Sequence, residues 1–185
     1  MTVGELIQRL RILLNDTQAI EFSDGELIGH INQAQDYIVQ TAVNLGFQGF
    51  IKKTTLTLTD GSSPLPVDFI REYSVVAGKY ILNAVPPDAE ISPKTYKIVG
   101  DKIFSRNDTL DLYYFFQPAY YTATTDVIQL PAVFNNLLME IVVYLAKNRI
   151  ELAGMDIQLA SLYEQKIAQI VSAYGNAFIE RPMPF

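Results

Sequence analysis

KKTTLTLTDGSS, residues 52–63, is the stretch of this sequence in which the hydrophobic pattern changes. Polar and apolar side chains alternate along it and stop at Asp60 and Gly61, which is typical of a half-exposed β-strand that ends in a turn. Before this stretch, and again after Pro131, apolar residues recur every three or four positions, as in amphipathic helices. The sequence therefore predicts helices, then a β region, then helices again.

Two helices are predicted before the change of pattern. The first covers residues 3–14 and the second runs from about 24 to 45. Ser23 can cap the second helix while Glu26, three residues later, reaches back to it, and Gly46 suits the position just after the helix end.

The predicted β region runs from 51 to 121 and contains a hairpin at YKIVGDKIFS, residues 96–105. Helical spacing returns over residues 132–153 and 156–174. The first of these helices is apolar almost all round its middle, which predicts burial on more than one side, either between bundle and sheet or against another subunit.

These patterns predict a mainly α fold with a β insertion, in the α+β class. We expect a four-helix bundle that is interrupted by a small antiparallel β-sheet domain and followed by an extended C-terminal tail. In this interpretation residues 1–175 form one domain, with the bundle at 1–49 and 131–175 and the β insertion at 50–122.

The composition argues against several classes of function. The net charge of −6 disfavours a nucleic-acid-binding surface, because such surfaces neutralise phosphates with Lys and Arg. The absence of cysteine excludes disulfides and cysteine-based metal sites and fits a reducing compartment. The most apolar run, residues 137–146, is about half a membrane span and contains Glu140, so it predicts a core helix and no membrane anchor.

Catalytic chemistry is weakly represented in the sequence. His30 is the only histidine, so no metal ligand set is complete, and we expect a structural role for it, no metal and no cofactor. The twenty carboxylates leave room for a glycosidase-type pair, but those at Asp24, Glu26, Asp60 and Asp101 stand where helix starts and turns favour acidic residues. The aromatic stretch LYYFFQPAYY, residues 112–121, favours core and subunit packing over base stacking, since basic residues are missing around it.

Three motifs occur in a characteristic order: MTVGELIQRLRILLND at 1–16, FSDGELIGHINQAQDYIV at 22–39 and SSPLPVDFIREYSVV at 62–76. This order resembles the head-to-tail adaptor proteins of tailed bacteriophages, which close the portal after genome packaging and carry the tail. Such proteins begin with a short helix, continue with a capped helix of the form ELIxxINxAQ, and carry an LPxDF segment at a strand start. Here that segment is formed by Leu65, Pro66, Asp68 and Phe69.

The resemblance implies a mechanical function without catalysis. It implies a homo-oligomeric ring under the portal protein, which we expect to be dodecameric, with a tail or nozzle protein below it and DNA passing through the lumen without specific binding. The all-round apolar third helix and the aromatic stretch would form the ring contacts. The expected location is the virion neck, with assembly in the host cytoplasm. The alternatives are another neck or head-completion ring protein and a virion-associated cell-wall hydrolase.

The resemblance also assigns a role to the apolar tail at 176–185. Pro182 and Pro184 keep this segment extended, and extended segments bind partners by strand addition or by placing side chains in pockets. A second interpretation has the tail fold back on its own bundle. Under the first, the portal-binding residues are Phe178, Ile179, Arg181, Pro182, Met183, Pro184 and Phe185.

Overall fold

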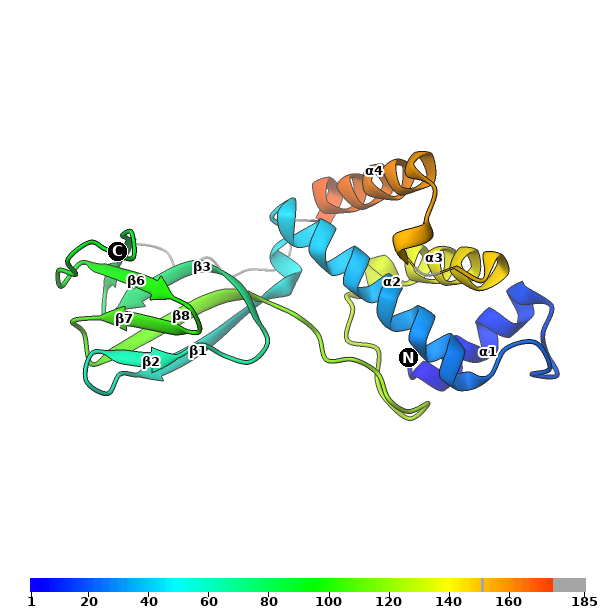
Figure 1. Cartoon of the computed structure of the whole chain (residues 1–185), viewed down its shortest axis with the longest axis horizontal. Coiled ribbons are helices and arrows are strands. Elements are labelled where there is room, and N and C mark those ends of the chain that lie inside the picture. The colour runs from blue at the N-terminus through cyan, green and yellow to red at the C-terminus, as the bar shows by residue number, and fades with distance from the viewer. Residues whose placement is uncertain (151, 175–185) are drawn as a thin grey trace. The chain divides into compact units, whose positions relative to one another are not determined.

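The structure, a computed structural model, describes residues 1–150 and 152–174 (Figure 1). Its described residues divide into two compact units, a helical unit formed by residues 1–49 and 118–174, and a β unit formed by residues 50–117. This composition agrees with the predicted α+β class. That residues 1–175 behave as one domain stays a prediction.

The first two helices have nearly the predicted ends, and the second has its predicted cap. Helix α1 spans Val3–Leu14 and α2 spans Asp24–Asn44. Thr2 with Glu5, and Ser23 with Glu26, form reciprocal capping boxes that satisfy backbone N–H groups at each helix start. Gly46 follows α2 with a φ of +78°, the left-handed conformation in which glycine ends helices.

The third helix is shorter than the sequence predicts. A 3-10 turn at Ala132–Phe134 precedes α3, which spans Asn135–Asn148 instead of 132–153. Arg149 takes a left-handed φ of 51° and its N–H bonds to the carbonyls of Leu145 and Ala146, which closes the helix. A second 3-10 turn at Leu152–Gly154 leads to α4, Ile157–Tyr174.

Helix α3 lies at the centre of the helical unit. It packs against both α1 and α2, which buries one broad side and leaves no exposure at Leu138, Ile141 and Leu145. The buried residues of α3 share this one side, so the structure does not show the predicted burial on more than one side, and burial against another subunit stays a prediction. Helix α4 packs mainly on α2, and among its described residues only Tyr163 and Ile167 are buried.

The loop between α1 and α2 is organised by a buried carboxylate. The Asp16 side chain, 4% exposed, accepts hydrogen bonds from the backbone N–H groups of Ile20, Glu21 and Phe22. Arg11 donates to Asp16 at 2.8 Å and to the carbonyl of Phe22 at 2.9 Å, and it pairs with Asp24 at 2.6 Å. These contacts fix the path of the chain from one helix to the next.

Acid is expected to destabilise this loop through Asp16. The pKa of Asp16 lies below its ordinary 3.8, first because the Glu21 N–H donates to the carboxylate. The N–H groups of Ile20 and Phe22 and the charge of Arg11 lower this pKa further, whereas burial acts in the opposite direction. A carboxylate with a lowered folded pKa stabilises the fold above its unfolded pKa, and this contribution is lost as pH falls through the folded pKa. Chemical denaturation below about pH 4 should therefore show a steeper stability loss for wild type than for Asp16→Asn. Parallel pH profiles would contradict this assignment.

The β unit contains two four-stranded sheets rather than one. The first has the order β1-β8-β3-β4 and is antiparallel throughout; the second has the order β2-β7-β6-β5, in which β5 pairs with β6 in parallel. The prediction of one small antiparallel sheet was therefore incomplete. The strands span Ile51–Thr57, Ser62–Pro64, Phe69–Ala77, Tyr80–Ile81, Asn83–Ala84, Thr95–Val99, Lys102–Ser105 and Thr109–Phe116, in order from β1 to β8.

The core of the β unit combines side chains from both sheets. Leu110, Leu112 and Tyr114 alternate along β8 and pack with Tyr96 and Ile103 of the second sheet. The predicted hairpin is present as β6 and β7, which are joined at Gly100, whose φ is +61°. The aromatic stretch thus contributes to core packing as predicted, because period-two alternation sends every second ring of β8 inward.

Candidate functional site

The predicted portal-binding residues lie outside the described part of the chain. Phe178, Ile179, Arg181, Pro182, Met183, Pro184 and Phe185 all belong to this undescribed segment, and their role stays a prediction. Among the described residues, the motifs, the surface hollows and the distribution of charge offer further candidate sites.

The polar residues of the ELIGHINQAQ motif hold the segment that follows the β unit. Asn32 donates to the carbonyl of Tyr121 at 2.9 Å and accepts from its N–H at 2.8 Å. The fully buried Gln35 donates to the carbonyls of Pro118 and Ala119, and Asp36 accepts from the Tyr120 hydroxyl. We call residues 118–121 the strap. The polar positions of this motif thus fasten a segment more than 80 residues away.

Asn32→Ala is expected to lower the free energy of unfolding of the helical unit by about 2 kcal/mol. The reason is that both backbone groups of Tyr121 lose their partner in a partly buried place. Denaturant unfolding measures the effect. Gln40→Ala, at an exposed position of the same helix, is the control and should change stability by less than about 0.5 kcal/mol. Equal effects of the two changes would show that the strap contacts contribute nothing.

The LPxDF segment ties together three strands of the first sheet. Asp68 accepts a hydrogen bond from the Tyr114 hydroxyl of β8 at 2.8 Å and pairs with Lys52 of β1, also at 2.8 Å. Its carbonyl accepts from the Gln117 N–H, and Phe69 stacks on Tyr114 with ring centroids 5.8 Å apart. The motif therefore fixes where β3 begins against β8 and β1, and its residues have a structural use.

Two more rings of the aromatic stretch, Tyr113 and Phe115, alternate along β8 with the core residues Leu112 and Tyr114. Tyr113 is partly exposed, and the Lys53 ammonium lies 5.6 Å from its ring centroid. Phe115 is buried, and Arg71 lies 4.8 Å from its ring centroid. Cation–aromatic contacts of this kind stabilise both rings.

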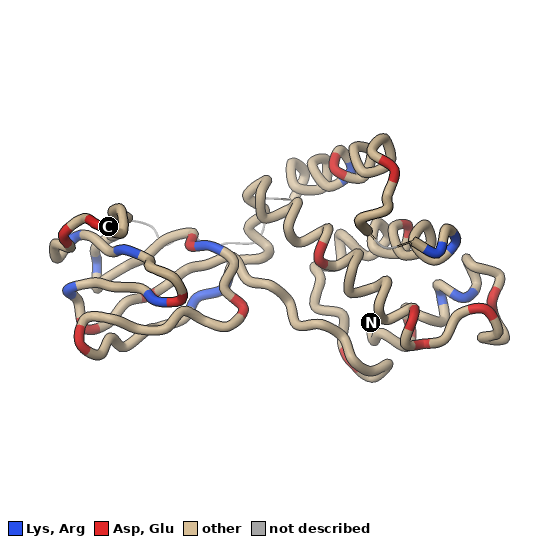
Figure 2. The backbone as a smooth tube through the Cα atoms, viewed as in Figure 1, with Lys and Arg blue, Asp and Glu red and all other residues tan. Residues whose placement is uncertain are grey.

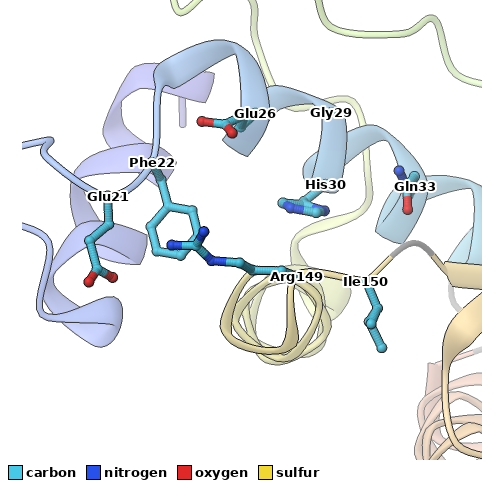
Figure 3. A pocket seen from close by; sticks show the side chains of 8 residues that line it. All are labelled: Glu21, Phe22, Glu26, Gly29, His30, Gln33, Arg149 and Ile150. Carbon is cyan, nitrogen blue, oxygen red and sulfur yellow. The ribbon is translucent and has the colours of Figure 1, made fainter.

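A hollow of about 320 Å³ lies between the start of α2 and the end of α3 (Figure 3). Figure 3 shows His30 and Gln33 on α2, with Arg149 and Ile150 on the chain segment that ends α3. Glu21, Phe22, Glu26 and Gly29 complete the lining. This hollow contains His30, for which the sequence predicts a structural role.

The electrostatics of the hollow are set by Glu26, His30 and Arg149. Hydrogen bonds from the Ser23 backbone and hydroxyl lower the pKa of Glu26, with smaller contributions from the charges of Arg149 and His30. Burial lowers the pKa of His30, although the negative charge of the nearby Glu26 carboxylate acts in the opposite direction. The imidazole is therefore neutral near pH 7. Its Nδ1 atom is buried and has no hydrogen-bond partner among the described residues.

A second hollow, of about 360 Å³, is lined by residues of α3 and α4. Its lining includes the apolar Leu137 and Ile170 and also Lys166 and Glu140, which form an ion pair. Within residues 1–150 and 152–174, no group of three or more His, Cys, Asp or Glu side chains is arranged to hold a metal ion. None of the helices in the same described ranges is both long and apolar enough to span a membrane.

Charge is divided unevenly between the two units (Figure 2). Residues 50–117 contain eight basic and eight acidic side chains, so the β unit has no net charge. The rest of the chain contains six basic and twelve acidic residues and therefore carries the whole net charge of −6. The basic residues are thus concentrated in the β unit, which sequence analysis alone did not bring out.

Comparison with known proteins identified one family. The family model described as SU10 adaptor protein matches residues 1–181. A search of curated proteins found no match. The family match confirms the resemblance to phage head-to-tail adaptors that the three motifs indicate.

Proposed function

We infer that this chain, which belongs to the SU10 adaptor protein family of phage head-to-tail adaptors, joins the portal to the tail as a ring that continues the DNA channel. The observation that carries this proposal is a family match over almost the entire chain. Membership makes the chain a phage adaptor and a structural protein of the virion neck. The ring, its twelve copies and the partners on either side are our proposal.

Exposed apolar side chains support the formation of a ring. A closed ring needs two different surfaces on each copy that fit one another. Helix α3 is used within its own unit, so we now assign the ring contacts to α4 and the β unit instead of α3. The exposed large apolar residues described in these parts are Ile157, Leu162 and Tyr174 on α4, and Val67, Tyr73, Tyr80, Ile81 and Val99 in the β unit.

The charge distribution supports passage of DNA without binding. A wall that contacts a moving duplex should not neutralise its phosphates, because each neutralised phosphate contributes to affinity. Outside residues 50–117 the chain carries twice as many acidic as basic residues, so any part of the channel wall formed there would repel the DNA phosphates. The positive charges of Lys52 and Lys53 in the β unit are paired with Asp68 and Asp111.

Imaging of the chain mixed with portal protein tests the proposal. We expect electron microscopy to show a closed ring of copies in contact with their neighbours below the portal. Copies that bind the portal singly, without contact to a neighbour, would contradict the ring. No binding to portal would contradict the adaptor assignment at this junction.

We also propose that the chain has no catalytic activity. An adaptor acts by holding two assemblies together, which requires surfaces rather than reacting groups. Incubation of the purified protein with peptidoglycan should release no fragments. Digestion that is lost on changing two specific carboxylates would show that the hydrolase alternative is correct.

A further inference from the structure

Of the four sheet edges described in the β unit, the edge at β1 is the open one. The other three edge strands, β2, β4 and β5, are two or three residues long, and β2 ends in Pro64. Strand β1 has seven residues, contains no proline and pairs with β8 without a shift of register. Short strands, prolines and bulges are features with which proteins block unwanted pairing at a sheet edge. Strand β1 has none of them.

The lysines of β1 leave this edge open as well. Lysine side chains at an edge discourage pairing because an incoming strand would have to cover their charge. Here the Lys52 ammonium pairs with Asp68 and the Lys53 ammonium pairs with Asp111, each at 2.8 Å. Both charges are thus balanced by carboxylates of the β unit itself.

The hydrogen-bonding pattern shows which backbone groups of β1 face outward. Just beyond the last pair of β1 with β8, the Leu58 N–H donates to the Asp108 carbonyl at 2.8 Å. Because the direction of these bonds alternates along a strand, the even-numbered residues of β1 face β8 and the odd-numbered residues face away from it. The outward N–H and C=O groups of Lys53, Thr55 and Thr57 have no hydrogen-bond partner among the described residues. An extended chain can pair with this row.

The tail at 176–185 has a matching row of backbone donors. Pro182 and Pro184 stand two positions apart, so both missing N–H groups belong to the same edge of an extended chain. The other edge, formed by Arg181, Met183 and Phe185, keeps every N–H group. Such a segment can pair with a strand through one edge, while its prolines stop a further strand from joining at the other.

Antiparallel pairing would also match the side chains. Residues opposite one another in an antiparallel pair have their side chains on the same face. Ile51 of β1 is partly exposed and lies opposite Phe115, so the odd-numbered residues of β1 share a face with that ring. The tail residues with free N–H groups include the apolar Met183 and Phe185, and pairing would bring them to this apolar face.

We propose that the edge of β1 binds the tail of a second copy of this chain as an added antiparallel strand. An open strand edge and an apolar segment each favour aggregation of the free chain, and this pairing covers both. The proposed docking to portal would use the same tail residues. The contact with β1 therefore belongs to the chain before docking, and the portal then releases the edge.

Peptides that differ in the position of one backbone methyl group test the pairing. A fluorescent peptide of residues 176–185 is titrated with the intact chain, and its anisotropy should show saturable binding. A methyl group on the backbone nitrogen of Met183 removes an N–H of the pairing edge and should weaken binding at least about tenfold. The same group on Glu180 lies on the edge of the prolines and should change the affinity less than about twofold.

Two substitutions at one position locate the site on β1. Thr55→Pro removes an outward N–H group and should weaken the peptide at least about tenfold. An edge strand tolerates proline where the N–H faces away from its neighbour, and thermal melting checks that this variant is folded. Thr55→Ala also loses the side-chain hydrogen bond to Asp111 but keeps the N–H, so its affinity should stay within about twofold of wild type.

Association of the intact chain tests whether a second copy supplies the strand. Sedimentation of the free chain should show association that increases with concentration. Thr55→Ala should associate like wild type, and Thr55→Pro should associate at least about tenfold more weakly, because it loses one backbone donor of the contact.

Several results would overturn the proposal. These are no binding of the peptide, equal affinity for the two methylated peptides, unchanged affinity in Thr55→Pro, and a chain that stays monomeric at every concentration. The measurements use neither portal protein nor an assembled ring, so failure here is distinguishable from failure of the proposed function.

Discussion

Replacing Arg11 with alanine is expected to lower the free energy of unfolding of the helical unit by about 3 kcal/mol. Arg11 is only 8% exposed and its guanidinium serves three acceptors, on Asp16, Phe22 and Asp24. Removing it leaves the buried carboxylate of Asp16 without its cation and the carbonyl of Phe22 without its donor. A buried ion pair that loses one partner costs several kcal/mol, far more than an exposed pair.

Urea or guanidinium unfolding of the whole chain measures this change. Arg9→Ala is the matched control, because it removes an exposed arginine of the same helix and should cost less than about 0.5 kcal/mol. Arg11→Lys should give an intermediate loss, since an ammonium keeps the charge but cannot serve three separated acceptors as a planar fork does. A loss of stability in Arg11→Ala no larger than that in Arg9→Ala would show that the loop is held by its backbone contacts alone.

Features with a local cause were predicted from the sequence with good accuracy. The capping box of Ser23 and Glu26 and the hairpin around Gly100 depend on residues within a few positions of one another. The ends of α1, α2 and α4 likewise follow from short-range spacing and breaker residues. Such signals are contained in the chain segment itself, so periodicity and turn chemistry were sufficient.

Features that depend on distant segments were not predicted. Gln35 lies on the apolar face of α2 between Ala34 and Ile38, and its polarity at a buried position was the signal that a backbone segment packs there. The identity of that segment, the strap, depends on the path of the chain through the β unit. The same holds for the division into two sheets, because a two-residue strand such as β5 has no pattern of its own.

The end of α3 shows a different kind of failure. Apolar spacing continues through Ile150 and Leu152, so the pattern favours a helix to 153. In the structure the helix ends at Arg149, whose backbone is left-handed, a conformation that is unfavourable for arginine. This mismatch between residue type and backbone conformation at Arg149 is why the spacing pattern overestimated the length of the helix.

Ending the chain at Gly175 is expected to weaken binding to portal protein at least about a hundredfold and to leave the melting temperature nearly unchanged. The removed segment carries four apolar side chains, at Phe178, Ile179, Met183 and Phe185. Full burial of such side chains in pockets contributes about 1.5–3 kcal/mol each. Two prolines reduce the entropy lost when the segment becomes ordered on a partner.

A second variant separates the chemistry of the tail from its length. This variant has serine at the four apolar positions, Phe178, Ile179, Met183 and Phe185. It keeps the ten residues, the prolines and the charges of Glu180 and Arg181. We expect it to reduce portal binding nearly as much as the truncation does. Arg181→Ala alone should have a smaller effect, because one exposed ion pair contributes little. The same two variants test the interpretation in which the tail covers its own helical unit. In that case the truncated and serine variants would melt at a lower temperature than wild type, because each would uncover apolar surface. Separately, portal binding at wild-type affinity by either variant would place the docking surface elsewhere on the chain.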